Sequence, residues 1–224
     1  MHRTIDEDLS KLKAKIGEMG TLVEDSLMAV MRAVQDQDMV ALAAVDSLEE
    51  RINELQMQTD HDCLQVLAKQ SPLATDLRTI LAIVRATADL ERMGDQAVNI
   101  SHCAKELLKK DSELRAPTDF TRMAASTRRM VRDAMQAFER MNSDRAREVL
   151  QQDDEIDGFK RRITNELMDA MEKEPTKIRM MFQWVLIARN LERIADHATN
   201  LAEEVIFATS GCDVRHGHLD EFKS

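Results

Sequence analysis

Two segments of the chain carry polar side chains at a spacing that suits metal ligands on one face of a helix. Residues 89–102 read DLERMGDQAVNISH and residues 190–203 read NLERIADHATNLAE. In each segment two acids, an amide and a fourth polar residue follow one another at intervals of three or four. They are Glu91, Asp95, Asn99 and His102 in the first segment, and Glu192, Asp196, Asn200 and Glu203 in the second. At about 100° per residue, each set falls within about 80° of a helix circumference.

An acidic pair precedes each of these segments on what we expect to be the preceding helix. The pairs are Asp46-x-x-x-Glu50 and Asp153-x-x-x-Asp157. Antiparallel packing of the two helices would bring two acidic rows together across one groove. Carboxylates one turn apart repel each other, and burial raises that cost. A bound cation would remove it, so each half of the chain predicts a metal site.

The residue types restrict which metal such a site would take. Ligation by carboxylates and an amide suits magnesium, manganese or iron, and zinc becomes possible if His102 joins. No histidine has a glutamate three residues before it, which disfavours the di-iron centre of ferritin-like bundles. The competing interpretation is a pair of solvated helix faces. In that case the acids would be neutralised by the nearby arginines, which are Arg85, Arg92, Arg189 and Arg193.

Long helices must carry these residues. The chain has 6 glycines and 3 prolines in 224 residues, too few for the turns of an all-β fold. Apolar residues recur at intervals of three and four, and this pattern predicts six helices. Their expected ranges are about 5–36, 38–69, 71–110, 118–141, 143–173 and 174–209. Ser71-Pro72 and Glu174-Pro175 are expected to open the third helix of each half.

The repeated order of helices and motifs predicts two tandem, similar three-helix bundles. We expect the first bundle at residues 1–110, a linker at 111–117, the second bundle at 118–210 and a flexible tail at 211–224. Cys212, His216 and His218 in that tail offer a second, weaker metal-binding pattern. The prediction is therefore an all-α protein with one acidic motif pair in each bundle.

Charge and cysteine usage exclude several classes of protein. The chain holds 31 basic and 41 acidic residues, a net charge of −10, which disfavours nucleic acids and anionic membrane surfaces as direct partners. The sequence shows no signal peptide and no apolar stretch long enough to span a bilayer. Three cysteines without a Cys-x-x-Cys pair suit a reducing cytosol. A cytoplasmic location is expected.

The motifs together resemble the PhoU family of phosphate-uptake regulators. The resemblance rests on the two Leu-Glu-Arg segments, the earlier segments DSLEERI and DDEIDGF, and SPLATDLR at residues 71–78. It implies a cytoplasmic homodimer that is not an enzyme and touches the membrane only through its partners. Those partners would be the ATPase of a phosphate ABC transporter and a membrane sensor histidine kinase. The implied role is to repress the phosphate-starvation response when phosphate is plentiful.

The resemblance also implies iron or zinc clusters on the acidic motifs. The implied ligands are Asp46, Glu50, Glu91, Asp95 and Asn99 in the first half, and Asp153, Asp157, Glu192, Asp196, Asn200 and Glu203 in the second. His102 stands where the second half has Glu203, and its role as a ligand is left open. Two other functions compete with the regulator: a metal-dependent phosphohydrolase and a metal-free helical spacer.

Overall fold

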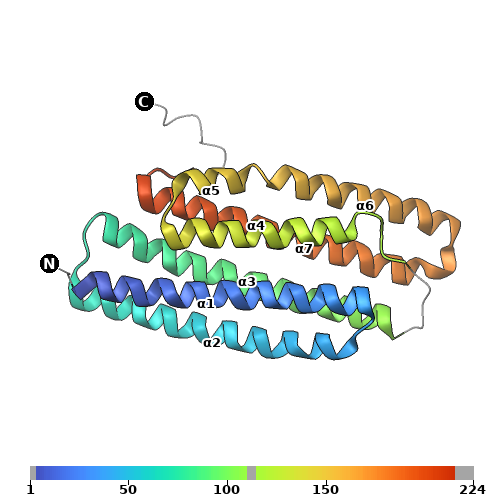
Figure 1. Cartoon of the computed structure of the whole chain (residues 1–224), viewed down its shortest axis with the longest axis horizontal. Helices are drawn as coiled ribbons and strands as arrows, with labels where there is room; N and C mark the ends of the chain where they lie inside the picture. Colours follow the sequence, from blue (N-terminus) through green and yellow to red (C-terminus); the bar gives the residue numbers. More distant parts are fainter. Residues whose placement is uncertain (1–3, 110–114, 215–224) are drawn as a thin grey trace.

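The structure, a computed structural model, describes residues 4–109 and 115–214, and over those residues it contains helices and no strand. The helices are α1 Thr4–Asp36, α2 Met39–Gln70, α3 Thr75–Leu108, α4 Phe120–Arg140, α5 Ser143–Leu150, α6 Asp153–Lys173, the 3-10 turn η1 Pro175–Lys177, and α7 Ile178–Ser210. The first three pack together, and the remainder form a second bundle (Figure 1). The predicted fold of two tandem three-helix bundles is confirmed.

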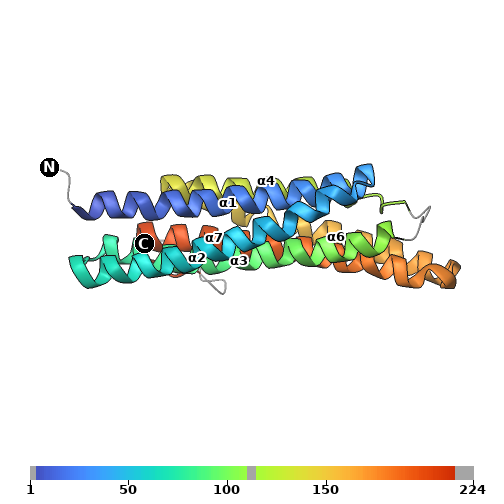
Figure 2. The same cartoon turned by 90° about the horizontal axis from the view of Figure 1, so that it is seen from below.

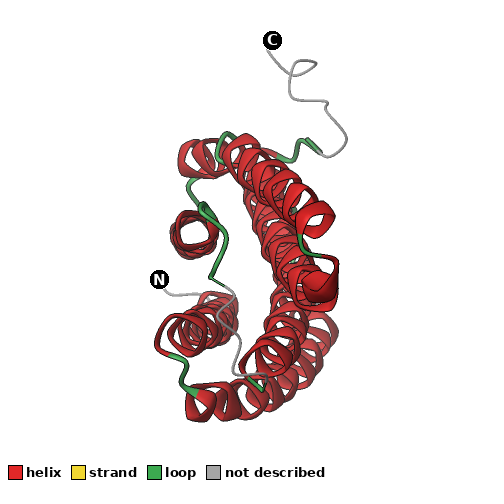
Figure 3. Ribbon diagram, turned by 90° about the vertical axis from the view of Figure 1, so that its right-hand side faces the viewer, coloured by secondary structure: helices red, strands yellow, loops and turns green. Residues whose placement is uncertain are grey.

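The helices lie in two layers. Figure 2 shows α1 and α4 in one layer and α3, α7 and α6 in the other, while α2 slants from beside the end of α1 into the second layer. Seen end-on, the larger layer curves around the smaller one (Figure 3). The buried side chains of α1 follow the spacing of three and four that the sequence predicts: Leu12, Ile16, Met19, Val23 and Leu27. Each such side chain contributes roughly 1.5–3 kcal/mol on burial, so the apolar faces between the layers hold the bundles together.

The third helix begins later than predicted. Ser71 does not cap it; this residue ends α2 in the left-handed conformation, with φ of 43°. Pro72 lies in the loop, and α3 starts at Thr75 after Ala74, whose side chain makes no capping hydrogen bond. In the second half, Pro175 opens η1 and α7 follows it directly. The Ser-Pro pattern was misread because a serine before a proline also suits the end of a helix.

The predicted fifth helix is broken into α5 and α6. At the break, Gln152 N–H donates to the Val149 carbonyl and Glu155 N–H donates to the Gln152 carbonyl, both three residues back. Gln152 Nε2 also donates to Asp133 Oδ2 of α4 at 2.9 Å. The first turn of α6 carries Asp153, Asp154 and Glu155, which favour a helix start there. The break therefore places the predicted acidic motif of the second half at a helix N-terminus.

Two seams join the bundles. α3 lies antiparallel to α7: Arg78 Nε donates to the Ala208 carbonyl at 3.3 Å, while Asp89, further along α3, bonds Asn200, which comes earlier on α7. In the other layer, α1 contacts α4. Each seam thus pairs one helix from each half of the chain.

Parts of the predicted linker and tail lie outside the described residues. Of the linker 111–117, residues 115–117 are placed in a loop, and Pro117 is buried. Of the tail 211–224, residues 211–214 are placed, and Val214 packs into the core. His216 and His218, the histidines of the second metal pattern, fall outside the described residues. In the described part, no helix is both long and apolar enough to cross a membrane.

Candidate functional site

The acids predicted in the second half come together where α6 begins. Asp153 and Asp157 on α6 lie close enough to Glu192 and Asp196 on α7 for their charges to interact. Burial raises the pKa of Asp153 to about 6, and the repulsion from Asp196, Asp157, Asp154 and Glu192 adds to that rise. Burial raises the pKa of Asp196 as well, and repulsion from Glu192 and Asp157 adds to that rise. We call Asp153, Asp157, Glu192 and Asp196 the α6–α7 acidic cluster.

One lysine offsets part of this charge. Lys160, on α6 one turn beyond Asp157, donates from Nζ to Glu192 Oε1. His197 and then Lys160 lower the pKa of Asp196 against burial and the neighbouring acids. Glu192 is largely buried, with 18% of its side chain exposed. The Lys160 ammonium group therefore occupies the position that a cation bound between α6 and α7 would take, and the two would compete for it.

The first half does not bring its predicted acids together in the same way. Asp46 pairs with Lys105 at 3.2 Å, and Lys105 lies about 20 Å along α3 from Glu91. Glu50 is exposed. Burial raises the pKa of Glu91, repulsion from Asp95 and more weakly from Glu49 adds to the rise, and Arg92 opposes it. On α2 it is thus Glu49 whose charge reaches Glu91.

Glu49 was missed at the sequence level although a signal for it exists. Val45 and Ile52 are buried, and Glu49 lies four residues after the first and three before the second. That spacing puts Glu49 on the face of α2 that meets the core, while Asp46 is rotated away from it. Asn53 Nδ2 donates to Glu49 Oε1 and helps to fix its side chain.

The two predicted amide ligands lie at the α3–α7 seam. Asn200 Nδ2 donates across the seam to Asp89 Oδ1 at 3.1 Å. Asn99 is exposed and lines a cavity at the seam together with His102. Glu203, the counterpart of His102, is half-buried on α7. The structure therefore sets these four residues beside the seam.

A buried polar network at the seam was not predicted. Asp89 is 6% exposed. Its Oδ1 lies 2.9 Å from Nδ1 of His197 and also accepts a hydrogen bond from Asn200. Arg92 approaches the same oxygen at 3.9 Å. Next to it, Arg85 Nη1 donates to Glu204 at 3.0 and 3.2 Å, and Glu204 is 4% exposed. The sequence contains one signal of this network: the second repeat has Asn190 where the first repeat has Asp89.

The donor types suit an oxygen-preferring cation, but the side chains do not form a ready ligand sphere. Carboxylates from two helices converge in the α6–α7 acidic cluster, which is the chemistry that magnesium, manganese or iron prefers. Among residues 4–109 and 115–214, however, no group of three or more His, Cys, Asp or Glu side chains is arranged to hold a metal ion. Metal binding there would need side-chain rearrangement, above all of Lys160.

The chain is similar to proteins of known family. The PhoU domain matches residues 16–104 and 120–205, one match in each bundle. The chain is 34% identical over 209 residues to the phosphate-specific transport system accessory protein PhoU homolog of Pseudomonas putida, covering 93% of this chain and 82% of that one. It is 30% identical over 216 residues to the phosphate-specific transport system accessory protein PhoU of Escherichia coli, covering 96% of this chain and 88% of that one.

The fold agrees with this match. A crystal structure of PhoU from Pseudomonas aeruginosa superimposes with a TM-score of 0.89 at 31% sequence identity, covering 93% of this chain and all of that one. The sequence match runs through both bundles, and the structural match extends over the seam between them. This protein belongs to the PhoU family.

Proposed function

We propose that this protein is a non-enzymatic accessory regulator of phosphate transport that acts in the cytoplasm. The observation that carries the proposal is the match to relatives over both bundles, because those relatives are named as accessory proteins of phosphate-specific transport systems. A net charge of −10 supports action through protein partners rather than on nucleic acid or on an anionic membrane.

In this proposal the protein is a homodimeric adaptor between a phosphate ABC transporter and a sensor histidine kinase. It signals that phosphate is plentiful by contacts with the transporter ATPase and the kinase, so that the starvation response stays repressed. Its contact with the membrane is through those partners. Two bundles in one chain, joined along α3 and α7, suit a protein that must touch two partners at once.

Gene deletion tests the regulatory role. A reporter of the phosphate-starvation response should rise in the deletion strain under high phosphate, and the wild-type gene should restore repression. A reporter that stays repressed without the gene would remove the proposal and favour the metal-free spacer.

Metal binding is the second part of the proposal, with iron or zinc first and manganese or magnesium next. What supports it is the convergence of the four carboxylates of the α6–α7 acidic cluster, whose mutual repulsion a cation would relieve. The first half offers Glu49, Glu91 and Asp95 as a weaker counterpart. Bound metal would stiffen the contact between neighbouring helices of each bundle.

Elemental analysis of protein purified without chelator tests this part. We expect metal in the wild type and about half as much in Glu192→Ala/Asp196→Ala. Adding Glu91→Ala/Asp95→Ala to that variant should remove the remaining metal. Equal metal content in all three proteins would exclude these acids as ligands.

The phosphohydrolase alternative is checked on the same proteins. Purified wild type is assayed with a phosphate monoester and each of the four metals in turn. Turnover that disappears when Glu91, Asp95, Glu192 and Asp196 are all changed to alanine would replace the regulator with an enzyme.

A further inference from the structure

The internal repeat gives every residue of the α3–α7 seam a counterpart on the other helix. Glu91 corresponds to Glu192, and the pairing continues in step along both helices. Because α3 and α7 run antiparallel, the two ends of the seam are local copies of one another. Differences between the two ends therefore show what distinguishes them chemically.

At one end the seam is filled by two buried acids and their hydrogen-bond partners. The Asp89 carboxylate accepts from Asn200 and lies against His197, and Arg85 lies 3.0 Å from the buried Glu204. Arg85 also stacks over the ring of Phe207, at 5.3 Å from its centre.

At the other end the counterparts carry no acid. Asn190 occupies the position that corresponds to Asp89, and Cys103 occupies the one that corresponds to Glu204. Leu186 corresponds to Arg85, and Asn99 corresponds to Asn200. These four residues border a cavity of about 390 Å³ between α3 and α7. That volume lies within the usual range of small-molecule sites. We call it the seam pocket.

A histidine and two arginines complete the lining. The remaining residues are His102 on α3, and Arg189 and Arg193 on α7. The two arginines are one turn apart on the same helix face. Within the described part of the chain neither has an ion-pair partner, and the lining contains no carboxylate. The nearest acids along α3, Asp95 and Glu106, lie one turn beyond either end of the lining.

These groups donate hydrogen bonds from two helices toward one space. Each guanidinium offers a planar set of N–H groups suited to phosphate oxygens, and the amide of Asn99 and the ring of His102 donate from the opposite wall. Asn190 Nδ2 already donates one hydrogen to the Leu186 carbonyl at 2.8 Å and keeps a second. Donors on both walls suit a tetrahedral group better than a planar carboxylate.

We propose that the seam pocket binds a tetrahedral oxyanion, either inorganic phosphate or the phosphate group of a small monoester. The anion would bridge Arg189 and Arg193 of the second bundle to Asn99 and His102 of the first. The proposal stands on the pocket and its charge, and does not depend on the regulatory role or on metal binding.

Isothermal titration of the whole protein with inorganic phosphate, and separately with glycerol 3-phosphate, tests the proposal. Chelator is kept in the buffer so that metal on the acidic clusters does not contribute. We expect one site per chain with a dissociation constant of about 1 mM or below at low salt. Tighter binding of the monoester would identify an ester as the ligand, and tighter binding of phosphate would identify the free ion.

Two variants carry the specificity of the test. Arg189→Ala/Arg193→Ala removes the cations, and Asn190→Asp restores the acid that the other end of the seam has; each should weaken binding about tenfold or more. Arg92→Ala, the counterpart of Arg193 outside the pocket, is the matched control and should bind as the wild type does. Circular dichroism confirms that each variant is folded. The proposal would be overturned if the wild type bound neither probe at concentrations up to about 10 mM. It would also be overturned if the folded pocket variants bound as tightly as the wild type.

Discussion

Arg85 of the first bundle and Glu204 of the second form an ion pair at 3.0 Å across the seam that joins the two halves of the chain. Glu204 is almost completely buried, whereas 38% of the Arg85 side chain reaches solvent. The pair therefore ties the bundles together at the edge of their shared core, where a carboxylate depends on a neighbouring cation.

Changing Arg85 alone should destabilise the protein more than changing the pair. Arg85→Leu removes the guanidinium from a buried carboxylate, and because Arg85 is partly exposed we expect a loss of about 2 kcal/mol in the free energy of unfolding. The double variant Arg85→Leu/Glu204→Cys copies the other end of the seam and should lose less. Chemical denaturation measures both values, and a double variant that is less stable than the single one would contradict the prediction.

Substitution of Gly20 should disturb the contact between α1 and α4, whereas substitution of Gly17, three residues earlier on α1, should not. A Cβ added at Gly20 would lie 2.5 Å from Cε of Met135, whereas one added at Gly17 would meet nothing within 4 Å. Gly17→Ala should raise stability by about 0.5–1 kcal/mol through helix propensity, and Gly20→Ala should lose that gain because Met135 must move. Thermal unfolding compares the two variants. In a Met135→Ala background, the difference in stability between Gly17→Ala and Gly20→Ala should become smaller.

Removing one charge from the α6–α7 acidic cluster should stabilise the metal-free protein. Burial, and after it repulsion from the neighbouring acids, raises the Asp153 pKa, and Asp153→Asn removes the charge on which both act. In chelator we therefore expect a melting temperature about 2–4 °C higher, corresponding to about 1 kcal/mol. Asp154→Asn changes the same charge at an exposed neighbour and should have a smaller effect. With metal added, wild type should gain more stability than Asp153→Asn; equal melting temperatures for wild type and Asp153→Asn in chelator would contradict the repulsion.

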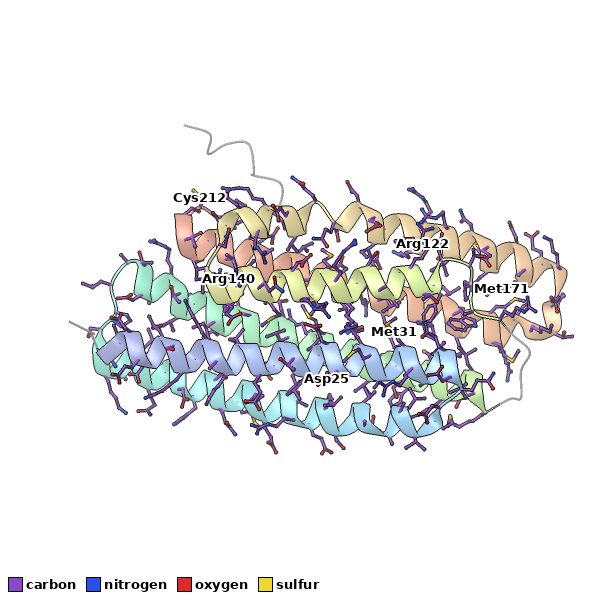
Figure 4. All side chains as sticks on the ribbon, viewed as in Figure 1. Asp25, Met31, Arg122, Arg140, Met171 and Cys212 are labelled. Carbon is purple, nitrogen blue, oxygen red and sulfur yellow. The ribbon has the colours of Figure 1, made fainter. Side chains whose placement is uncertain are left out.

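The three cysteines should differ in reactivity. Burial raises the pKa of Cys63 to about 12 and raises the pKa of Cys103, so both thiols stay protonated at pH 8. Cys212 is half-buried after the end of α7, and Figure 4 shows it far from the end of the molecule that carries Met171. A thiol reagent at pH 8 should therefore modify one cysteine per chain rapidly, and Cys212→Ser should abolish that phase. Rapid reaction of Cys63 in the folded protein would contradict its burial.

The helices and the two-bundle order follow from the sequence because apolar periodicity is a local property. The start of α3 was misplaced since Ser71-Pro72 can end one helix or begin another, and the left-handed Ser71 serves the end of α2. The break before Asp153 was missed for a related reason: the apolar pattern continues through it, while the tight turn at Gln152 is held by a contact with Asp133 on another helix.

The sites depend on contacts that local patterns do not contain. Asp153, Asp157, Glu192 and Asp196 could be grouped from repeat and spacing alone, because both helices carry a clear motif. Asp46 and Glu49 could not be distinguished without knowing which face of α2 meets α3. The link from Asp89 to His197 joins residues from different repeats, so only the packing of one bundle on the other reveals it.

The antiparallel α3–α7 seam has the geometry of a two-fold interface between identical subunits, yet both sides belong to one polypeptide. In a true homodimer, a substitution at such an interface occurs twice, and an acid lost from one end is lost from both. Fusion of the two units in a single chain removes that constraint. Residues 89 and 190 can therefore differ, and one end of the junction can hold the bundles together while the other binds a ligand.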